Sequence, residues 1–360
     1  MIRCDALIVG GGPAGSTCAR MLRKAGWDVV VADCGRFPRD KVCAGWLTPD
    51  VFRLLELEPA EYRSTGLTLQ DITGFRTGVL GSRLLETRYP HIVSYAIRRC
   101  EFDEFLLRRA NVRVLEGTRV ALLRPTSDGW IVNDAIETPV VIGAGGHFCP
   151  VARHMRGGAE TVRPVVAKEA EVRLKPLHAP RASEMPELFF CRDLEGYGWV
   201  VPKGDYLNVG IGRREGREFM THVRGFISLL EATGDLPPGT RLTWRGHAYL
   251  ASGTGSRPLV AQGTLLVGDA AGLAYPESGE GIRPAIESGR VAAETLIAAG
   301  GRYDLDALAP YAGALRRLYP PARQTPPLLR GTMAALGRVL LGSRVFTKHV
   351  MLDRWFLRRT

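Results

Sequence analysis

Three glycines near the start of the chain have the spacing of a phosphate-binding turn. Gly10, Gly12 and Gly15 form a Gly-x-Gly-x-x-Gly pattern, with Pro13 and Ala14 inside it. The first glycine makes the tight turn, the second lets the backbone approach a pyrophosphate, and the third lets a helix pack closely on a strand. The free N–H groups and the dipole at the start of that helix favour an anion. These five residues are therefore predicted to bind the diphosphate of a dinucleotide.

A carboxylate stands where the ribose of such a dinucleotide needs one. The sequence predicts a buried strand over 5–9, a helix over 16–24 and a second strand over 27–32, which is followed by Asp33. This is one βαβ unit of about thirty residues, as the dinucleotide fingerprint requires. Asp33 can accept hydrogen bonds from ribose hydroxyls, and we include the adjacent Cys34 in the predicted cofactor site.

A second glycine cluster, near residue 280, favours FAD over NAD. Gly268 and Asp269 directly follow a short apolar strand, so this carboxylate can hold a ribityl chain. Gly279, Gly281 and Ile282 then offer backbone N–H groups at the start of a predicted helix that runs to residue 299. A reduced flavin carries negative charge near N1 and the C2 carbonyl, and a helix N-terminus aimed there stabilises that charge.

The elements that position these residues predict an α/β fold. Between about residues 165 and 250 the pattern changes to the alternation typical of antiparallel sheet, and the chain then returns to a strand–turn–helix pattern. We predict a Rossmann-like FAD-binding domain, an interleaved antiparallel β-sheet substrate domain and a C-terminal helical tail. The expected boundaries are 1–50, 95–160 and 255–320 for the FAD-binding domain, 51–94 and 161–254 for the substrate domain, and 328–360 for the basic helical tail.

Positive charge is concentrated at the end of the chain. Residues 301–360 hold eleven basic and three acidic side chains, which accounts for +8 of the net charge of +11. A basic and apolar tail fits a membrane surface or an acidic protein partner. Nucleic acid is not an expected partner, because the chain contains no recognised reader motif and few aromatic residues stand among these arginines.

The cysteines and the apolar runs exclude other classes of protein. The seven cysteines are scattered and form no Cys-x-x-Cys pair, so neither a disulfide framework nor a metal site is expected. No cleavable signal segment is recognisable, and no apolar run reaches the roughly eighteen residues of a spanning helix. We therefore expect a cytoplasmic protein that can bind peripherally to a membrane surface.

The sequence resembles the FAD enzymes of the p-hydroxybenzoate hydroxylase group and, within that group, the geranylgeranyl reductases. The resemblance covers about residues 4–320 and includes Gly10–Gly15, Arg99-x-x-Phe102-Asp103 and the segment from Gly268 to Ile282. Two further segments are similar to the reductase branch in particular. They are Phe37-Pro-Arg-Asp-Lys-Val-Cys-Ala-Gly-Trp46, which resembles a Lys-x-Cys-Gly-Gly segment, and Gly196-Tyr-Gly-Trp-Val-Val-Pro-Lys-Gly204, which resembles a Gly-Trp-x-x-Pro-Lys-Gly strand pair.

This resemblance implies an activity and roles for individual residues. It implies two-electron reduction of carbon–carbon double bonds in an apolar, isoprenoid-like substrate, with hydride from flavin N5 and a proton from a nearby acid. Cys43 matches the cysteine of the motif and is the candidate proton donor, since a thiol can supply a proton near neutral pH. Arg99 is expected to contact FAD. Tyr197 and Trp199 should roof the flavin, where they contact substrate or pack in the core, whereas Lys203, in a hairpin turn, is expected to be solvated.

The chain departs from the patterns of this group at two places. Cys43-Ala44-Gly45 replaces Cys-Gly-Gly and is followed by the bulky Trp46. The segment 143–153 lacks the acid that the hydroxylases use for FAD and NADPH binding, and no second dinucleotide turn is present. The reductant is therefore expected to be NAD(P)H that docks transiently, or an electron-donor protein.

Other flavin chemistry stays open at this stage. A flavin-dependent monooxygenase acting on an aromatic or polypeptide-bound substrate is the main alternative, because nothing in the motifs forbids it. A halogenase is disfavoured, since the Trp-x-Trp-x-Ile-Pro element of that branch is absent and the matching strand carries the single tryptophan Trp199.

Overall fold

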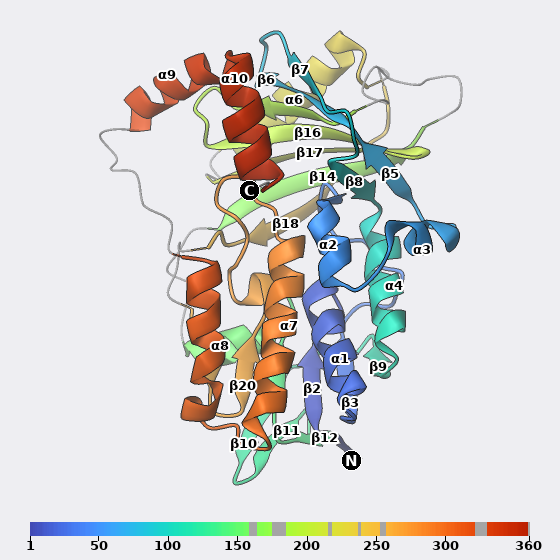
Figure 1. Cartoon of the computed structure of the whole chain (residues 1–360), viewed down its shortest axis with the longest axis vertical. Helices are drawn as coiled ribbons and strands as arrows, with labels where there is room; N and C mark the ends of the chain where they lie inside the picture. The colour runs from blue at the N-terminus through green and yellow to red at the C-terminus, as the bar shows by residue number, and fades with distance from the viewer. Residues whose placement is uncertain are drawn as a thin grey trace.

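The computed structural model describes most of the chain and shows two sheets stacked along the long axis of the molecule (Figure 1). A helix-covered, mostly parallel sheet lies in the lower half, and a large antiparallel sheet lies across the upper half. The described residues are 1–157, 164–174, 185–214, 218–236, 239–252, 257–320 and 330–358.

The lower sheet has the strand order β19–β20–β13–β2–β3–β9, in which all neighbours except β19 and β20 run parallel. Every residue of its central strands β2 and β3 is buried, as expected for strands covered on both faces. A smaller sheet, β1–β12–β11–β10, flanks it. The strands are Val260–Ala261, Thr264–Leu266, Val141–Gly143, Ala6–Val9, Val29–Asp33 and Arg113–Glu116, then Ile2–Arg3, Ile136–Thr138, Gly129–Val132 and Leu123–Thr126.

Helices α1, α4 and α7 stand beside one another on the lower sheet (Figure 1). A Cβ added to Gly15 in α1 would lie 2.0 Å from the carbonyl oxygen of Gly10, and one added to Gly289 in α7 would lie 2.4 Å from that of Ala14. Only glycine allows these close approaches. The helices of this half are Pro13–Lys24 (α1), Arg99–Ala110 (α4), Pro150–Arg156 (α5), Ile282–Ala299 (α7) and Leu305–Leu318 (α8), with a short 3-10 turn at Gly268–Ala270.

The upper sheet has the order β18–β14–β17–β16–β15–β6–β7 and is antiparallel except where β15 meets β6. A smaller sheet, β4–β8–β5, and helices α2 and α3 connect it to the lower half. The strands are Arg245–Tyr249, Val165–Arg173, Tyr206–Arg213, Gly196–Lys203, Glu187–Phe190, Gly74–Val79 and Leu85–Arg88, then Trp46–Leu47, Ser94–Ile97 and Leu69–Ile72; the helices are Pro49–Leu54 and Pro59–Ser64.

The two faces of the upper sheet are covered by different parts of the chain. Helix α6 (Phe219–Thr233) packs on one face, where Val200 of β16 belongs to its core. The next residues along β16, Trp199 and Val201, point to the opposite face and pack with the C-terminal segment. This alternation is the period of two that a strand imposes on its side chains.

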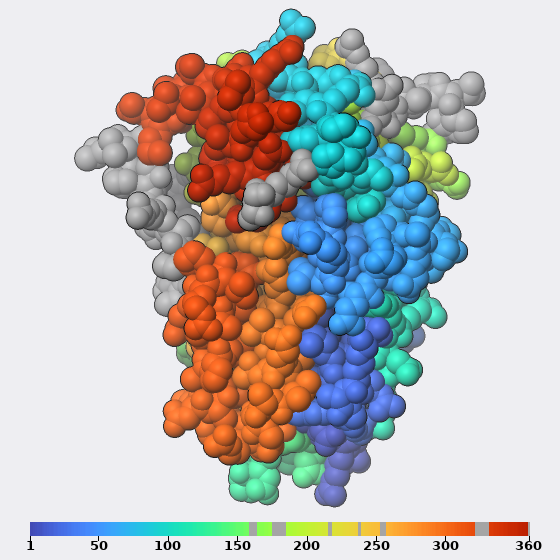
Figure 2. Space-filling view, in the orientation of Figure 1, coloured from blue at the N-terminus to red at the C-terminus, as the bar shows by residue number. Residues whose placement is uncertain are grey.

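The C-terminal segment consists of α9 (Arg330–Leu341), the short α10 (Arg344–Phe346) and a π-helical stretch, Thr347–Phe356. The π-helical stretch buries Met351 and Phe356 on the upper sheet, whereas α9 projects from it at the upper left of Figures 1 and 2. Within the described residues, no helix combines the length and the apolar character that crossing a bilayer requires.

The predicted fold class is confirmed: an α/β FAD-binding fold with antiparallel sheet and C-terminal helices. Element boundaries differ in detail. The first helix begins at Pro13 instead of Ser16, and the last strand of the alternating region predicted between about residues 165 and 250 is Arg245–Tyr249. The predicted tail, 328–360, is described over 330–358 and is not one continuous helix. The domain boundaries stay a prediction.

Candidate functional site

A cavity of about 1010 Å³ lies between the two sheets. This volume is at the upper end of the range, about 300–1,000 Å³, of pockets that hold small molecules and cofactors. Both glycine clusters line it, as do Cys43, Arg99, Tyr197 and Trp199. Gly15 is the exception among the predicted site residues: it supports the loop from beneath, against the carbonyl of Gly10.

The first glycine loop presents a bare helix N-terminus to the cavity. Gly12 is the N-cap of α1; no side chain in the described part of the chain caps it, and the first turn contains no acidic residue. A Cβ added to Gly12 would meet only Arg39 Nη2, at 3.6 Å. The free N–H groups and the dipole of α1 are therefore available to a diphosphate.

Asp33 and Arg39 shape the adenosine end of the cavity. Asp33 accepts hydrogen bonds from the backbone N–H of Gly11 (2.7 Å, Oδ2) and of Gly35 (2.8 Å, Oδ1), so it holds the turn closed as well as lining the cavity with Cys34. Arg39 Nη2 lies 3.4 Å from Asp33 Oδ2. Arg39 was not among the residues predicted from the sequence, although it lies in the segment 37–46 that resembles the geranylgeranyl reductases.

Arg39 is the clearest sign that this end of the cavity takes an anion. Its Nε is buried and has no hydrogen-bond partner among the described residues. A buried guanidinium N–H without an acceptor costs on the order of 1–3 kcal/mol, and a phosphate oxygen would satisfy it. The donor set and the open N-terminus of α1 thus fit the diphosphate of FAD.

Arg99 is buried at the start of α4 and is not a surface cap. Its guanidinium forms a bidentate ion pair with Asp103, with Nε 2.8 Å from Oδ1 and Nη2 3.0 Å from Oδ2. Burial lowers the pKa of Arg99, but Asp103 and Cys43 outweigh it and raise the pKa above its ordinary value. Arg99 is therefore a fixed positive charge in the cavity wall.

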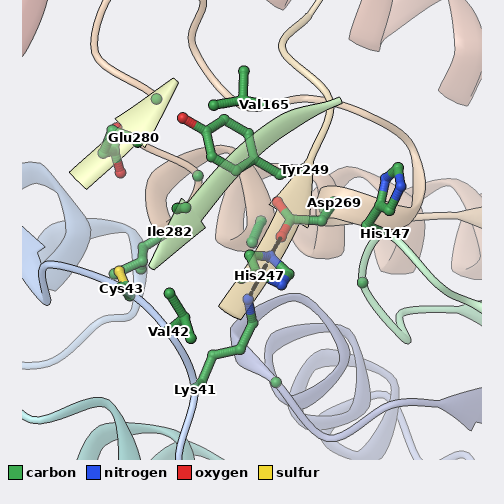
Figure 3. Close-up of a pocket in the computed structure, with 18 of the residues that line it drawn as sticks. Lys41, Val42, Cys43, His147, Val165, His247, Tyr249, Asp269, Glu280 and Ile282 are labelled. Carbon is green, nitrogen blue, oxygen red and sulfur yellow. Dashed lines mark hydrogen bonds and ion pairs between the residues drawn. The ribbon is translucent and has the colours of Figure 1, made fainter. Parts of the chain in front are cut away.

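Three titratable side chains meet at the centre of the cavity (Figure 3). His247 Nε2 lies 2.7 Å from Lys41 Nζ and 3.3 Å from Asp269 Oδ2. Burial raises the pKa of Asp269, but the hydrogen bond from His247 and the charge of Lys41 outweigh it and lower the pKa well below its usual range. Burial lowers the pKa of both Lys41 and His247, against the opposing carboxylate. Asp269 is thus held as a carboxylate.

His247 could not be identified from the sequence, because it belongs to no recognisable motif. It lies on β18, which comes to face Asp269 only when β18 pairs with β14 at the edge of the upper sheet. Lys41 lies two residues before Cys43 and is brought to the same place by the irregular chain between β3 and β4.

The second glycine cluster places the N-terminus of α7 at the cavity. Gly281 is its N-cap and has no side chain, although the Glu280 carboxylate accepts the Arg283 N–H of the first turn at 2.7 Å (Oε1). A Cβ on Gly281 would approach Asp269 Oδ1 to 3.2 Å. Gly279 has φ +69°, and a Cβ on it would collide with the Tyr249 hydroxyl. Bare backbone at these positions lets a planar ring approach the start of Ile282.

Cys43 lines the cavity on a loop that a buried carboxyl group holds from below. The backbone N–H of Cys43 donates to Glu169 Oε2 at 2.7 Å, and Gly45 N–H donates to Cys43 Sγ at 3.3 Å. Burial raises the pKa of Glu169 to about 7, although Lys203 and the Cys43 N–H oppose the shift. Asn208 Nδ2 also donates to Glu169, at 3.2 Å.

The expectation that Lys203 is solvated is wrong. Lys203 is 1% exposed, and its Nζ donates to Glu171 Oε2 at 2.9 Å. Its hairpin turn is present, with Gly204 at φ +57°, but the side chain points back under the Cys43 loop, where a Cβ on Gly45 would come within 2.7 Å of it. The ion pair makes this burial possible.

Aromatic side chains from distant parts of the chain form the other wall of the cavity. Trp46 stacks on Phe75 (4.8 Å between ring centroids) and on Phe356 (5.5 Å), and Tyr197 meets Phe356 edge-on at 5.6 Å. Trp199 lines the cavity while its Nε1 donates to Asn208 Oδ1 at 2.8 Å. Tyr197 and Trp199 thus pack in the core and also face the cavity.

The cavity therefore has two chemically different ends. One offers helix N-termini, arginines and a carboxylate, which suit a dinucleotide, and the other offers aromatic and aliphatic walls, which suit an apolar molecule. Among the described residues, no group of three or more His, Cys, Asp or Glu side chains is arranged to hold a metal ion.

Comparison with known proteins agrees with this division. Residues 3–63 match the model of the FAD binding domain. The chain is 29% identical over 335 residues to a menaquinone reductase of Mycolicibacterium smegmatis, covering 83% of this chain and 77% of that protein. It is 29% identical over 328 residues to a digeranylgeranylglycerophospholipid reductase of Methanothermobacter thermautotrophicus, covering 84% and 80%.

A solved structure shows the same fold over the whole chain. It is a geranylgeranyl bacteriochlorophyll reductase-like protein from Thermoplasma acidophilum, with a TM-score of 0.75 and 20% identity over 100% of this chain and 92% of that one. The protein is an FAD-dependent oxidoreductase. More closely, it is related to the geranylgeranyl reductases and to menaquinone reductase.

Proposed function

We propose that this protein reduces a carbon–carbon double bond of an apolar, isoprenoid-like substrate. The observation that carries the proposal is the position of Cys43 in the wall of one cavity, between the loops that fit FAD and the aromatic wall around Phe356. The names of the relatives support it, since they include reductases of menaquinone and of digeranylgeranyl lipids.

The residues assigned to the cofactor divide along its length. We propose that the first glycine loop, Asp33, Cys34 and Arg39 bind the adenosine diphosphate half. Arg99, the second glycine loop and Asp269 then bind the ribityl and ring half. When bound, the flavin supplies a hydride equivalent, which is two electrons and one proton. The chain's own residues must orient the substrate, exclude water and supply the second proton.

Cys43 is proposed to supply that proton. Two basic side chains, Arg99 and Lys41, lie close enough to Cys43 to interact with it electrostatically. As one carbon of the double bond takes the hydride, the other takes the Cys43 proton, and the thiolate left behind faces the Arg99 guanidinium. A proton from solvent then restores the thiol, so the product gains two hydrogens and the reductant loses two electrons.

Tyr197, Trp199 and the aromatic wall are proposed to hold the substrate. Their rings offer apolar area with few flexible bonds, so binding an extended hydrocarbon there loses little conformational entropy. The reductant is proposed to be NAD(P)H or an electron-donor protein.

Single-turnover reduction tests the proposal. The FAD-loaded protein is reduced chemically without oxygen and mixed with detergent-dispersed menaquinone or digeranylgeranyl lipid in deuterium oxide. We expect the flavin colour to return together with a product whose isoprenoid chain carries two additional hydrogens, both deuterium, because the flavin N5–H and the thiol proton both exchange with solvent. Cys43→Ser should keep FAD bound and slow this step by about 10²–10⁴-fold, the usual contribution of a general acid.

A matched control and two contrary results complete this test. Cys100→Ser changes a half-buried thiol on α4 that does not line the cavity, and it should leave the rate unchanged. An unchanged rate in Cys43→Ser removes Cys43 from the mechanism. In a parallel run into which air is admitted, a product that contains an oxygen atom from O2, in place of added hydrogen, replaces the reductase with the alternative, a flavin-dependent monooxygenase.

A further inference from the structure

Helix α9 carries an exposed apolar ridge, which we define as Met333, Leu336 and Val339. These residues are 54%, 59% and 73% exposed, and Val345, in the following α10, is 71% exposed. The spacing of three residues places the ridge along one face of the helix. Large aliphatic side chains this exposed and this close together mark an interaction surface more often than isolated ones do.

The charge around the ridge indicates what covers it. In the sequence, residues 330–358 contain six Arg or Lys and a single acid, Asp353. Asp353 accepts a hydrogen bond from the Tyr89 hydroxyl at 2.7 Å and lies 3.3 Å from His349 Nδ1. Arg338, Arg344 and Arg354 are exposed. Arg338 lies on the other side of α9 from Leu336 and donates to the Arg192 carbonyl at 2.7 Å. A segment with an apolar ridge and this excess of positive charge complements a surface that is both apolar and negatively charged.

The opposite side of α9 belongs to the cavity. Gly337 and Leu341 line the cavity, together with Phe346 of α10 and Trp355. One helix therefore has the apolar end of the substrate cavity on one side and the exposed ridge on the other. In Figures 1 and 2 this helix projects from the upper left of the molecule.

We propose that α9 docks the protein on an anionic lipid bilayer, with the ridge inserted among the acyl chains and the neighbouring arginines on the lipid phosphates. Interfacial helices bind in this way, through buried apolar area and attraction to anionic lipid. Docking brings the apolar end of the cavity to the membrane, which is where an isoprenoid-like substrate dissolves. The identity of that substrate rests on the proposed function, but the docking itself does not.

Vesicle flotation of the oxidised, FAD-loaded protein tests the docking without any turnover. We expect flotation with vesicles of phosphatidylcholine mixed with phosphatidylglycerol, and much less with phosphatidylcholine alone or in high salt. Leu336→Asp should lower the vesicle partition coefficient about tenfold or more, because it removes one inserted aliphatic side chain and adds a repelled charge. Its FAD content and its thermal unfolding should stay those of the wild type, since Leu336 is exposed.

Leu305→Asp is the matched control. Leu305 is 53% exposed on α8, outside the ridge, so this variant should float as the wild type does. Absence of flotation with anionic vesicles overturns the proposal, and so does equal flotation of wild type and Leu336→Asp. A dimer in sedimentation that Leu336→Asp converts to a monomer, without flotation, also overturns it and assigns the ridge to a second copy of the chain.

The docking and the proposed function fail separately. If flotation depends on Leu336 but no double bond is reduced in detergent, the docking stands and the reductase proposal falls. If detergent-dispersed substrate is reduced equally by wild type and Leu336→Asp while neither protein floats, the reductase proposal stands and the docking is rejected.

Discussion

The two ends of the cavity are built in different ways. The diphosphate end is formed by residues within one stretch of the chain, from Gly10 to Arg39, whose backbone N–H groups and charges are positioned by a single βαβ unit. The aromatic end joins Trp46, Phe75, Tyr197 and Phe356, which come from four elements far apart in the sequence.

On the proposed assignment, this difference separates the residues that bind the cofactor from those that hold the substrate. The cofactor end depends on backbone geometry that glycine alone permits, so it tolerates almost no change. The substrate end depends on the packing of large side chains, which can be replaced singly at a cost in stability and fit. Substitutions at the two ends should therefore give different signatures.

Gly15→Ala should have the largest effect on FAD binding. It should disrupt the cofactor end of the cavity and leave the aromatic end intact. Its Cβ would lie 2.0 Å from the carbonyl oxygen of Gly10, so the loop and α1 must separate. We expect the affinity for FAD to fall by more than about 100-fold, measured by titration of the apoprotein. Gly225→Ala, on α6 with open space around it, is the control and should bind FAD normally. Retention of FAD by Gly15→Ala would contradict the predicted role of the loop.

Phe356→Ala should break the aromatic end and leave the cofactor end intact. Removing this buried ring should lower the free energy of unfolding by about 3–5 kcal/mol, and it should raise KM for the apolar substrate with FAD still bound. Phe226→Ala is the control, because Phe226 is also buried but lies on α6 and packs on the opposite face of the sheet. That variant should lose similar stability with KM unchanged. An equal KM effect in both variants would show that the wall does not hold substrate.

Glu169→Gln should change how the stability of the protein depends on pH. Glu169 joins the Cys43 loop, which lies between the two ends of the cavity, to the upper sheet. Its pKa is raised to about 7 in the folded protein, from an ordinary value near 4.5. The folded state thus binds an extra proton between these values, and the free energy of unfolding falls as the pH rises from about 4.5 to 7. The substitution should remove up to about 3 kcal/mol of this dependence, measured by denaturant unfolding at several pH values.

Glu171→Gln provides the contrast on the same strand. Burial raises the pKa of Glu171, but the charges of Lys203 and Arg98 outweigh it and lower the pKa. Its contribution to stability is therefore present above its ordinary pKa and is lost only in acid. This variant should be less stable at neutral pH but should keep the slope between about pH 5 and 7. If both variants show the same slope, Glu169 does not titrate near neutrality.

Arg39→Met should have the smallest effect and tests the buried Nε of Arg39, which has no hydrogen-bond partner among the described residues. Loss of charge-assisted hydrogen bonds to a phosphate should weaken FAD binding by about 2 kcal/mol, roughly 30-fold, with little change in thermal stability of the apoprotein. Arg53→Met, on the exposed surface of α2, should bind FAD as the wild type does. Unchanged affinity in Arg39→Met would place the diphosphate elsewhere.

Much of the fold and of the cofactor site could be predicted from the sequence. The first glycine loop, Asp33, Asp269 and the N-terminus of α7 all line the cavity, because each lies at a strand end or helix start that local periodicity reveals. The residues that were missed, Arg39, His247 and Glu169, belong to irregular chain or to strands of ordinary composition. Their positions depend on which strands pair, and no local pattern encodes that.

The sequence by itself determined the glycine loops, the order of strands and helices, and the charge of the tail, since these follow from residue type and spacing. Only the tertiary structure decided that Lys203 is buried, that His247 faces Asp269, and that Phe356 closes the cavity. The physical reason is the separation along the sequence over which each kind of interaction acts. Backbone conformation and helix dipoles act within a few residues, whereas burial and ion pairing join side chains that meet only after the two sheets and the C-terminal segment have packed together.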